Sequence, residues 1–457
     1  QLKRKTYEST PIPSQLKHAQ YAYGVRDYIK HEALIDSVRW DIDDFMNWVS
    51  SDHPRTKYKH LLQQYGADLD QIPKATQELV YYPTNKLRVL VNKENVLKSG
   101  VVKAEDADLI VDYIDIDLPT SGIYKNRLLM LDILKNNDWE RPIYFTGGSY
   151  DEEEYFWMKD YLQLEGLVYK LVPIRTPINP NNPYQMGRID ADKMYEIVKK
   201  WDWGNADSPN IYHDPETRKN SISFRSNISR LAESLIDEGQ TDKAIDVLDL
   251  AMDKMPLESF GYYSLLTPFV EAYYRAGAPS KAQNLMRELS KGYREYMAYY
   301  ASISLDDQYN MSTELLAYVE RYRSLVETLV QSRDYEALAE EYKLFYDAIK
   351  PFSYFYGDYD FYAELQAFVP ALYKANDAKA GLDLFEKIAT IYQNRLELYG
   401  SIEADDLTYY ASSILVDVEA YRSLLESLKR HEENQEILEA AQKTFDSASA
   451  RFEQLRS

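Results

Sequence analysis

Small residues, large apolar residues and turn residues recur at regular intervals in the second half of this 457-residue chain. The first copy of the pattern consists of Ala232, Leu235, Gly239, Ala244, Leu248, Ala251 and Pro256. It returns with Phe269, Tyr273, Gly277, Ala282, Met286 and Leu289. Two helices joined at a glycine approach closely where the facing residues are small, and proline ends the second helix. This spacing constrains the fold most, because it predicts helix pairs that stack on one another.

The spacing resembles that of tetratricopeptide repeats. Weaker copies and a last helical pair are marked by Ser332, Ala337, Ala375, Ala380, Leu384, Leu424 and Phe445. Successive turns lie 38, 55 and 43 residues apart, which indicates long helices or insertions between the units. We therefore expect residues 216–457 to form an all-α, tetratricopeptide-like solenoid. The concave face of such an array most often binds a protein segment.

The first 215 residues carry mixed helix and strand signals. Strands are expected at residues 87–91, 109–117, 141–146 and 167–174, although the start of the second could equally be a helix end. A helix is expected over residues 126–134, and another from a capping box at Ser149 and Glu152 through Leu164. This order predicts an α/β domain over residues 1–215, with βαβ packing on a partly parallel sheet. Its Pro/Asn-rich end, residues 175–215, is expected to be the hinge.

Composition excludes several classes of function. The net charge is −21, so repulsion by phosphates makes nucleic acid an unexpected partner. The absence of cysteine excludes disulfides, thiolate catalysis and cysteine-ligated metals. The six histidines form no His-x-x-x-His pair, and we predict no metal site, no cofactor and no catalytic residue in this chain. There is no apolar run of roughly 18 residues and no signal peptide. The chain opens at Gln1, and we expect it to be a segment of a longer protein.

The first binding candidate is a glycine turn between a predicted strand and a predicted helix: Thr146, Gly147, Gly148 and Ser149. Free N–H groups at a helix N-terminus favour an anion. The turn lacks the lysine of a phosphate loop and the spacing of a dinucleotide fingerprint. An ordinary glycine turn before a capped helix is the alternative.

The second candidate lies in residues 351–362, where seven of twelve residues are aromatic. Its candidate binding residues are Tyr354, Tyr356, Tyr359 and Tyr362. Such rings could stack on sugars or hold a peptide, or they could fill the gap between two helical repeats.

Three acidic groups, at Asp41/Asp43/Asp44, Asp112/Asp115/Asp117 and residues 151–154, have the residue types of a glycoside hydrolase or a cation site. Solvated or structural roles are the favoured interpretation. The third group stands in the first turn of a predicted helix, where negative charge is favoured, and the second alternates outward on a possible strand.

Several blocks resemble a large Bacteroidetes family of multi-spanning membrane proteins, formerly a domain of unknown function. The blocks are residues 82–86, 91–97, 124–126, 131–134, 137–145, 157–162, 186–190, 202–205 and 212–218. The family is similar to protein O-mannosyltransferases that use a lipid-linked sugar.

The resemblance implies an extracytoplasmic, periplasmic segment, tethered to the inner membrane through a region before residue 1 that also holds part of the α/β fold. The catalytic carboxylate would lie in that region, so this segment is not expected to be catalytic alone. Acceptor or client protein segments and the chain's own upstream membrane domain are the expected partners. The alternative is a non-catalytic periplasmic scaffold or adaptor, and a hydrolase is a third class.

Overall fold

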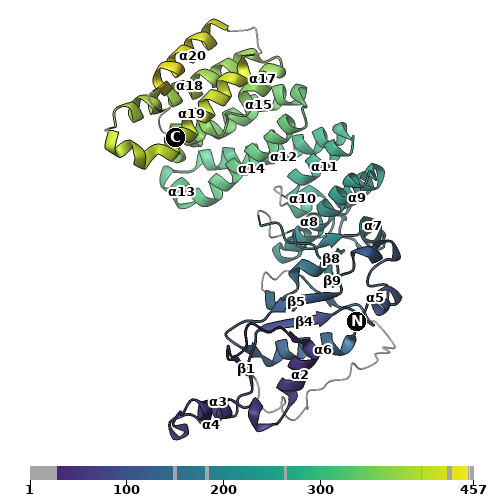
Figure 1. Cartoon of the computed structure of the whole chain (residues 1–457). Coiled ribbons are helices and arrows are strands. Elements are labelled where there is room, and N and C mark those ends of the chain that lie inside the picture. Colours follow the sequence, from purple (N-terminus) through teal and green to yellow (C-terminus); the bar gives the residue numbers. More distant parts are fainter. Residues whose placement is uncertain are drawn as a thin grey trace. The chain divides into compact units, whose positions relative to one another are not determined.

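The structure is a computed structural model that describes residues 28–147, 152–180, 185–261, 265–402, 404–429, 435–450 and 452. It divides into two compact units, residues 1–202 and 203–457 (Figure 1). The first unit contains strands and helices, and the second is helical. This confirms the expected fold class, an α/β domain followed by an all-α region.

Short mixed sheets form the first unit. Its strands are β1 (Tyr28–His31), β2 (Trp40–Asp41), β3 (Tyr81–Tyr82), β4 (Lys86–Leu90), β5 (Tyr113–Asp117), β6 (Ile123–Tyr124), β7 (Tyr144–Phe145), β8 (Leu162–Glu165), β9 (Val168–Leu171) and β10 (Arg188–Ile189). In the described residues the sheet orders are β3-β1-β6, β2-β4-β5 and β10-β8-β9-β7. Each sheet has one parallel pair (β1 with β3, β2 with β4, β8 with β10), and its other pairs are antiparallel. The sheets are therefore partly parallel, as expected.

The helices of the first unit are α2 (Ile42–Ser50), α3 (Tyr58–Gln64), α4 (Lys74–Gln77), α5 (Lys93–Lys98), α6 (Lys125–Asn137) and α7 (Ala191–Lys199). Asp41 caps the N-terminus of α2, and its carboxylate accepts a hydrogen bond from the Asp43 amide at 2.9 Å. Its buried face, with Phe45 and Met46, packs towards β4, and α6 lies beside it (Figure 1). These elements share one hydrophobic core with β4 and β5.

The predicted helix from Ser149 to Leu164 is wrong over its described part. Short 3-10 helices occupy residues 152–155 and 159–161, and Leu162 already belongs to β8. Phe156 and Trp157 have φ angles of 55° and 58°, which interrupt a right-handed helix. The segment 162–165 instead pairs antiparallel with β9, and Gly166 lies in the turn at a φ of 69°. The expected βαβ crossover is therefore absent here, since β7, β9 and β8 are joined by antiparallel pairing.

The second unit is a series of helices. They are α8 (Pro215–Asp237), α9 (Thr241–Lys254), α10 (Leu257–Phe260), α11 (Thr267–Arg275), α12 (Pro279–Ser302), α13 (Leu305–Asn310), α14 (Ser312–Gln331), α15 (Tyr335–Ile349), α16 (Gly357–Ala363), α17 (Phe368–Lys374), α18 (Ala378–Gly400), α19 (Ala404–Leu428) and α20 (Gln435–Ser449). A 3-10 helix over Lys350–Phe355 precedes α16.

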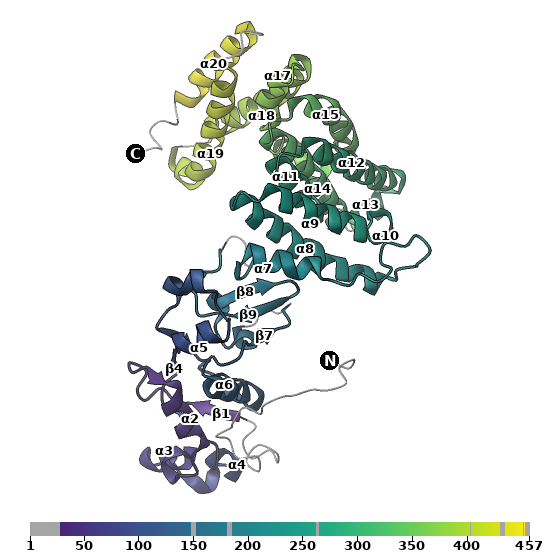
Figure 2. The same ribbon diagram turned by 90° about the vertical axis from the view of Figure 1, so that its right-hand side faces the viewer.

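These helices form consecutive pairs: α8 with α9, α11 with α12, α14 with α15, α17 with α18, and α19 with α20 (Figure 2). The first four pairs turn at residues with positive φ, namely Gly239, Gly277, Arg333 and Asn376. Glycine adopts this conformation without a steric penalty, whereas the arginine and asparagine do so at some cost. The uneven turn spacing arises because α12 has 24 residues and α13 is inserted before α14.

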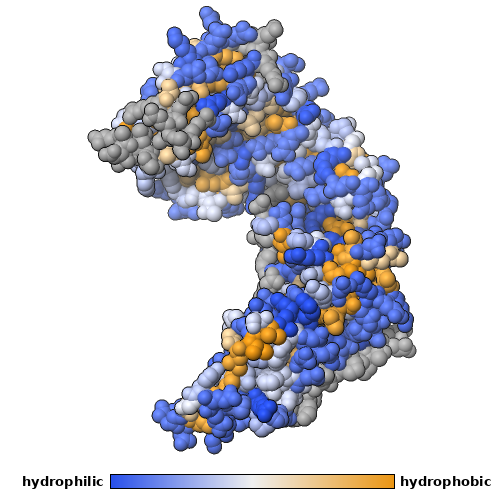
Figure 3. All heavy atoms as spheres, viewed as in Figure 1, coloured by the Kyte–Doolittle hydropathy of each residue, from blue (hydrophilic) through white to orange (hydrophobic). Residues whose placement is uncertain are grey.

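Small residues let the paired helices approach, as the spacing predicts. Ala232 in α8, Ala244 in α9 and Ala282 in α12 are all fully buried. At Gly381 in α18, an added Cβ would lie 2.8 Å from the ring of Tyr373 in α17. The surface seen in Figure 3 is mainly hydrophilic, but hydrophobic residues reach it in the region of α6, where Leu129 and Ile133 are exposed.

Candidate binding site

The glycine turn at Thr146 and Gly147 follows β7. Gly147 has a φ of 77°, and an added Cβ would lie 3.3 Å from the ring of Tyr169 in β9. A glycine is therefore required here by the turn itself. Gly148 and Ser149 lie outside the described residues. The continuous helix whose N-terminus would have favoured an anion is replaced by the short 3-10 helices described above.

The four candidate tyrosines of residues 351–362 do not converge on one surface. The Tyr354 hydroxyl donates a hydrogen bond to the side chain of Gln308, and its ring contacts those of Tyr309 and Phe355. Tyr356 lies near Arg323 of α14, and burial raises its pKa to about 12. The structure thus holds these two rings against α13 and α14.

Tyr359 joins a buried polar cluster between α18 and α19. Its hydroxyl donates to Asp417, which is only 1% exposed. Asp417 also accepts hydrogen bonds from Arg395 Nε at 2.7 Å and from the Tyr399 hydroxyl at 2.8 Å. The Arg395 guanidinium lies 3.7 Å from the centre of the Tyr359 ring. Tyr359 therefore connects α16 to α18 and α19. This contact agrees with the alternative in which the rings fill the gap between two helical repeats.

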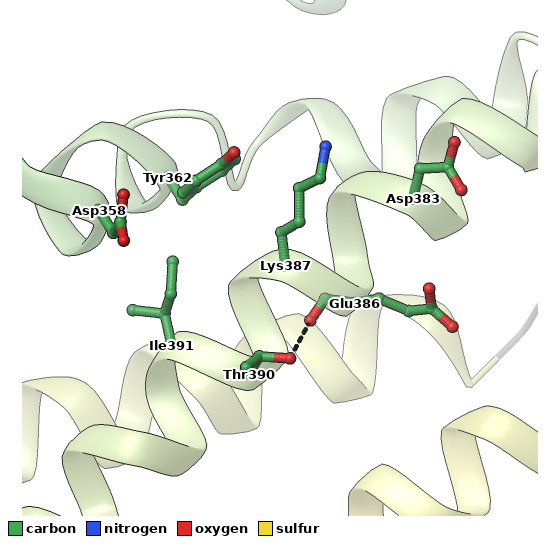
Figure 4. A pocket seen from close by; sticks show the side chains of 7 residues that line it. All are labelled: Asp358, Tyr362, Asp383, Glu386, Lys387, Thr390 and Ile391. Carbon is green, nitrogen blue, oxygen red and sulfur yellow. Dashed lines mark hydrogen bonds between the residues drawn. The ribbon is translucent and has the colours of Figure 1, made fainter. Parts of the chain in front are cut away.

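Tyr362 differs from the other three because it lines a hollow beside α18 (Figure 4). The hollow has a volume of about 540 Å³ and is lined by Asp358, Tyr362, Asp383, Glu386, Lys387, Thr390 and Ile391. The Tyr362 hydroxyl lies 3.2 Å from that of Tyr346 in α15, and Lys387 Nζ donates to Tyr346 at 3.1 Å. Burial and this contact raise the pKa of Tyr362 to about 12.

A second hollow of about 320 Å³ adjoins the first and shares Asp383 and Lys387 with it. It lies between α15 and α18, with Tyr342 and Tyr346 on one side and Ala380 on the other. The small side chain of Ala380, one of the residues of the repeat pattern, leaves this space open. Together the two spaces, here called the Lys387 hollow, are the candidate binding site.

The acidic groups noted in the sequence have structural partners. Asp43 pairs with Lys135 at 3.0 Å, Asp115 pairs with Arg88 at 2.8 Å, and Glu153 and Glu154 both pair with Arg127. The Arg88 hydrogen bonds lower the pKa of Asp115, which keeps it ionised. The hydrolase alternative needs a carboxyl group with a raised pKa. Asp115 has the opposite perturbation.

Sequence reasoning missed a polar row across the sheet β10-β8-β9-β7. Cross-strand pairing aligns Arg188, Gln163, Lys170 and Tyr144. Lys170 forms an ion pair with Glu165, and both side chains are less than 8% exposed. Glu165 also accepts hydrogen bonds from Gln163 at 2.9 Å and from Tyr144 at 3.0 Å. The alternation of polar and apolar residues at 162–165 was the available signal, but it was assigned to a helix.

Two carboxyl groups in the first helices of the array have a raised pKa. Glu233 of α8 and Glu271 of α11 are half-buried, and burial raises the pKa of both. The charge of Glu233 raises the pKa of Glu271 further, while Thr328 and Arg275 lower it. Each ionised group therefore destabilises the fold slightly at neutral pH.

Replacing one of these carboxylates should stabilise the protein. A folded-state pKa above the unfolded value gives stability that is present below the unfolded pKa and is lost as the pH rises through the folded pKa. We therefore expect Glu271→Gln to raise the unfolding free energy at pH 7 by about 0.5–1 kcal/mol, with a smaller gain at pH 4. Urea unfolding at both pH values measures this, with the exposed Glu288→Gln as control. A gain that is equal at both pH values would contradict the role of ionisation.

Two of the blocks that carry the family resemblance, residues 91–97 and 137–145, meet in the structure. Asn92 and Asn95 at the start of α5 donate hydrogen bonds to Asp138 at 2.8 and 3.0 Å. The neighbouring Trp139 is buried and donates from its indole to the Leu90 carbonyl at 3.1 Å. Asp138 and Trp139 have φ angles of 41° and 61°, so these contacts hold a strained helix end in place. The blocks thus build the junction between α5, α6 and β4.

The described residues form two units: a mixed α/β unit, and a unit of consecutive helix pairs that carries an open polar hollow. None of the described residues forms a cluster of three metal-ligating side chains. No helix among them is both long and apolar enough to cross a membrane.

Comparison with known families gives one result. Residues 1–193 match the family model described as TMEM260-associated domain 2. The match covers the α/β unit up to the first turn of α7 and is consistent with a TMEM260-like, O-mannosyltransferase-like family. No curated protein and no solved structure matches the chain.

Proposed function

We propose that this chain is the extracytoplasmic part of a membrane-bound, protein O-mannosyltransferase-like glycosyltransferase, and that it binds the acceptor protein. The match of residues 1–193 to TMEM260-associated domain 2 carries the proposal. The sugar transfer itself is assigned to the region expected before residue 1. The periplasmic location and the tether to the inner membrane belong to the same proposal.

The helical unit supports the acceptor-binding part of the proposal. Its helices form consecutive pairs, and arrays of stacked helix pairs build extended surfaces that bind protein segments. Aromatic rings are available for contact, since Tyr309 and Tyr354 are 59% and 41% exposed and touch each other. Tyrosine gives large contact area with little loss of side-chain freedom.

The test begins in cells that make the complete protein. We expect deletion of its gene to remove O-linked hexose from a set of exported proteins, as measured by mass spectrometry of their peptides. The unglycosylated forms of those peptides should then bind this chain in fluorescence anisotropy. Tyr309→Ala should weaken binding several-fold, while Tyr65→Ala, an equally exposed tyrosine of the first unit, should not.

Two outcomes contradict the proposal separately. If deletion leaves every O-hexose in place, the glycosyltransferase role is wrong, and the scaffold or adaptor alternative is favoured. If the hexose is lost but none of the affected peptides binds this chain, the acceptor-binding role is wrong.

A further inference from the structure

We propose that the Lys387 hollow binds a neutral saccharide. This inference goes beyond the proposed function, because it assigns a sugar ligand to a specific place in the helical unit. It depends on the residues of α15, α16 and α18, and not on the family match.

The hollow offers one hydrogen-bond donor that is already oriented, the ammonium group of Lys387. Lys387 Nζ uses one N–H on Tyr346, at 3.1 Å, and forms no ion pair with any described carboxylate. The ammonium also lies 5.1 Å from the Tyr346 ring centre and 5.9 Å from that of Tyr362. These contacts fix its direction and leave its other N–H groups for a ligand. An oriented donor loses less conformational entropy on binding than a mobile surface lysine does.

Acceptors lie around the same space. Asp358 stands on α16, and Asp383 and Glu386 stand on α18 at the other side of Lys387 (Figure 4). The Thr390 hydroxyl donates to the backbone carbonyl of Glu386 at 2.7 Å, and its oxygen can still accept. Sugar hydroxyls both donate and accept, so they can use a lysine and several carboxylates at once.

Charge and shape exclude other classes of ligand. Four carboxylates line the two spaces, namely Asp358, Asp377, Asp383 and Glu386, and they outnumber the three lysines Lys343, Lys379 and Lys387. The carboxylates disfavour an anion such as a phosphate or a nucleic acid, and the lysines disfavour a strongly cationic ligand. The ring of Tyr362 and the side chain of Ile391 add apolar surface. The weakly positive C–H face of a sugar ring packs well on the negative face of an aromatic ring. The hollow is an open surface depression of about 540 Å³, so it suits a ligand that is held weakly and stays partly in solvent.

The test is a titration of the whole chain with methyl glycosides of neutral hexoses, in which binding is measured by saturation-transfer NMR. For a ligand of this size we expect a Kd on the order of 1 mM. Tyr362→Ala and Lys387→Met should each weaken binding about tenfold or more. Tyr212→Ala removes a tyrosine that is 82% exposed elsewhere in the unit and should change nothing. Because Tyr362→Phe keeps the ring, it should lose less affinity than Tyr362→Ala, which guards against a mere folding defect.

A second arm identifies the source of the sugar. Tighter binding of an O-hexosylated peptide than of its bare form, with loss in Lys387→Met, supports a protein-linked glycan in the hollow. Equal Kd values for that glycopeptide and the free glycoside support recognition of the sugar alone. The proposal is overturned if no hexoside transfers saturation up to about 50 times the expected Kd, or if binding is unchanged in both Tyr362→Ala and Lys387→Met. It is also overturned if glucuronate or glucosamine binds more tightly than every neutral hexoside.

Discussion

Lys170→Met should lower the unfolding free energy of the first unit by about 3–5 kcal/mol. Lys170 and Glu165 form a buried ion pair on the β8–β9 hairpin, where Gln163 and Tyr144 also donate to the carboxylate. Methionine keeps most of the apolar stem but leaves the Glu165 charge buried without a countercharge, which is the costly way to break such a pair. For a unit of this size the melting temperature should fall by roughly 6–12 °C or more.

The measurement can be confined to the first unit. Five of the six tryptophans lie before residue 203, so urea unfolding followed by tryptophan fluorescence reports mainly on this unit. The exposed Lys98→Met serves as control and should stay within about 0.5 kcal/mol of the parent.

A double variant separates the charge from the packing. Glu165→Gln combined with Lys170→Met removes both charges and keeps an acceptor for Gln163 and Tyr144. Most of the stability should return, giving a coupling free energy of about 2 kcal/mol or more. Additive losses in the double variant would show that Lys170 contributes packing rather than charge compensation.

Asp417→Asn should have the second largest effect, about 3 kcal/mol in the helical unit. The carboxylate is 1% exposed and accepts from Tyr359, Tyr399 and Arg395. The asparagine side chain has only one acceptor oxygen, and its N–H₂ group would face the donors that the second carboxylate oxygen now accepts from. Those buried donors would be left without an acceptor. Arg395 is partly exposed, which lets water solvate it and keeps the loss below that of a fully buried pair.

Far-UV circular dichroism during urea unfolding follows this unit, since it holds most of the helix. Asp360→Asn is the matched control, because Asp360 is exposed and only one position from Tyr359. Tyr359→Phe should cost about 1.5–2 kcal/mol, because its hydroxyl donates to a charged carboxylate and such hydrogen bonds are worth more than neutral ones. If Asp417→Asn cost no more than Asp360→Asn, the cluster would not fasten α16 to α18 and α19.

The helical array was predictable because its signal is local and repeated. Ala232, Ala244 and Ala282 are small where two helices meet, and Gly239 and Gly277 adopt the turn conformation that glycine favours. The two later turns were less evident, because Arg333 and Asn376 take positive φ without being glycine. Periodicity over hundreds of residues averages out such exceptions.

The predicted helix over residues 149–164 is wrong in its described part, from residue 152 onward, because the competing signals are of similar strength. A capping box and acidic residues favour a helix, and four residues of alternating polarity favour a strand. The segment 162–165 becomes a strand because it pairs with β9, and a helix before it is interrupted by the positive φ at Phe156 and Trp157. Neither can be read from a local window.

The sequence by itself determined the two-part architecture and the family resemblance of its first part. Only the tertiary structure decided what the conspicuous residues do. Tyr359 and Tyr362 are only three residues apart in the sequence. In the folded structure, Tyr359 contacts Asp417, whereas Tyr362 lines the Lys387 hollow. Lys170 and Glu165 are both buried in the folded structure, although lysine and glutamate are usually exposed to solvent. Helix periodicity is set by neighbouring residues, whereas the partner of a polar side chain is set by residues brought near it only when the chain folds.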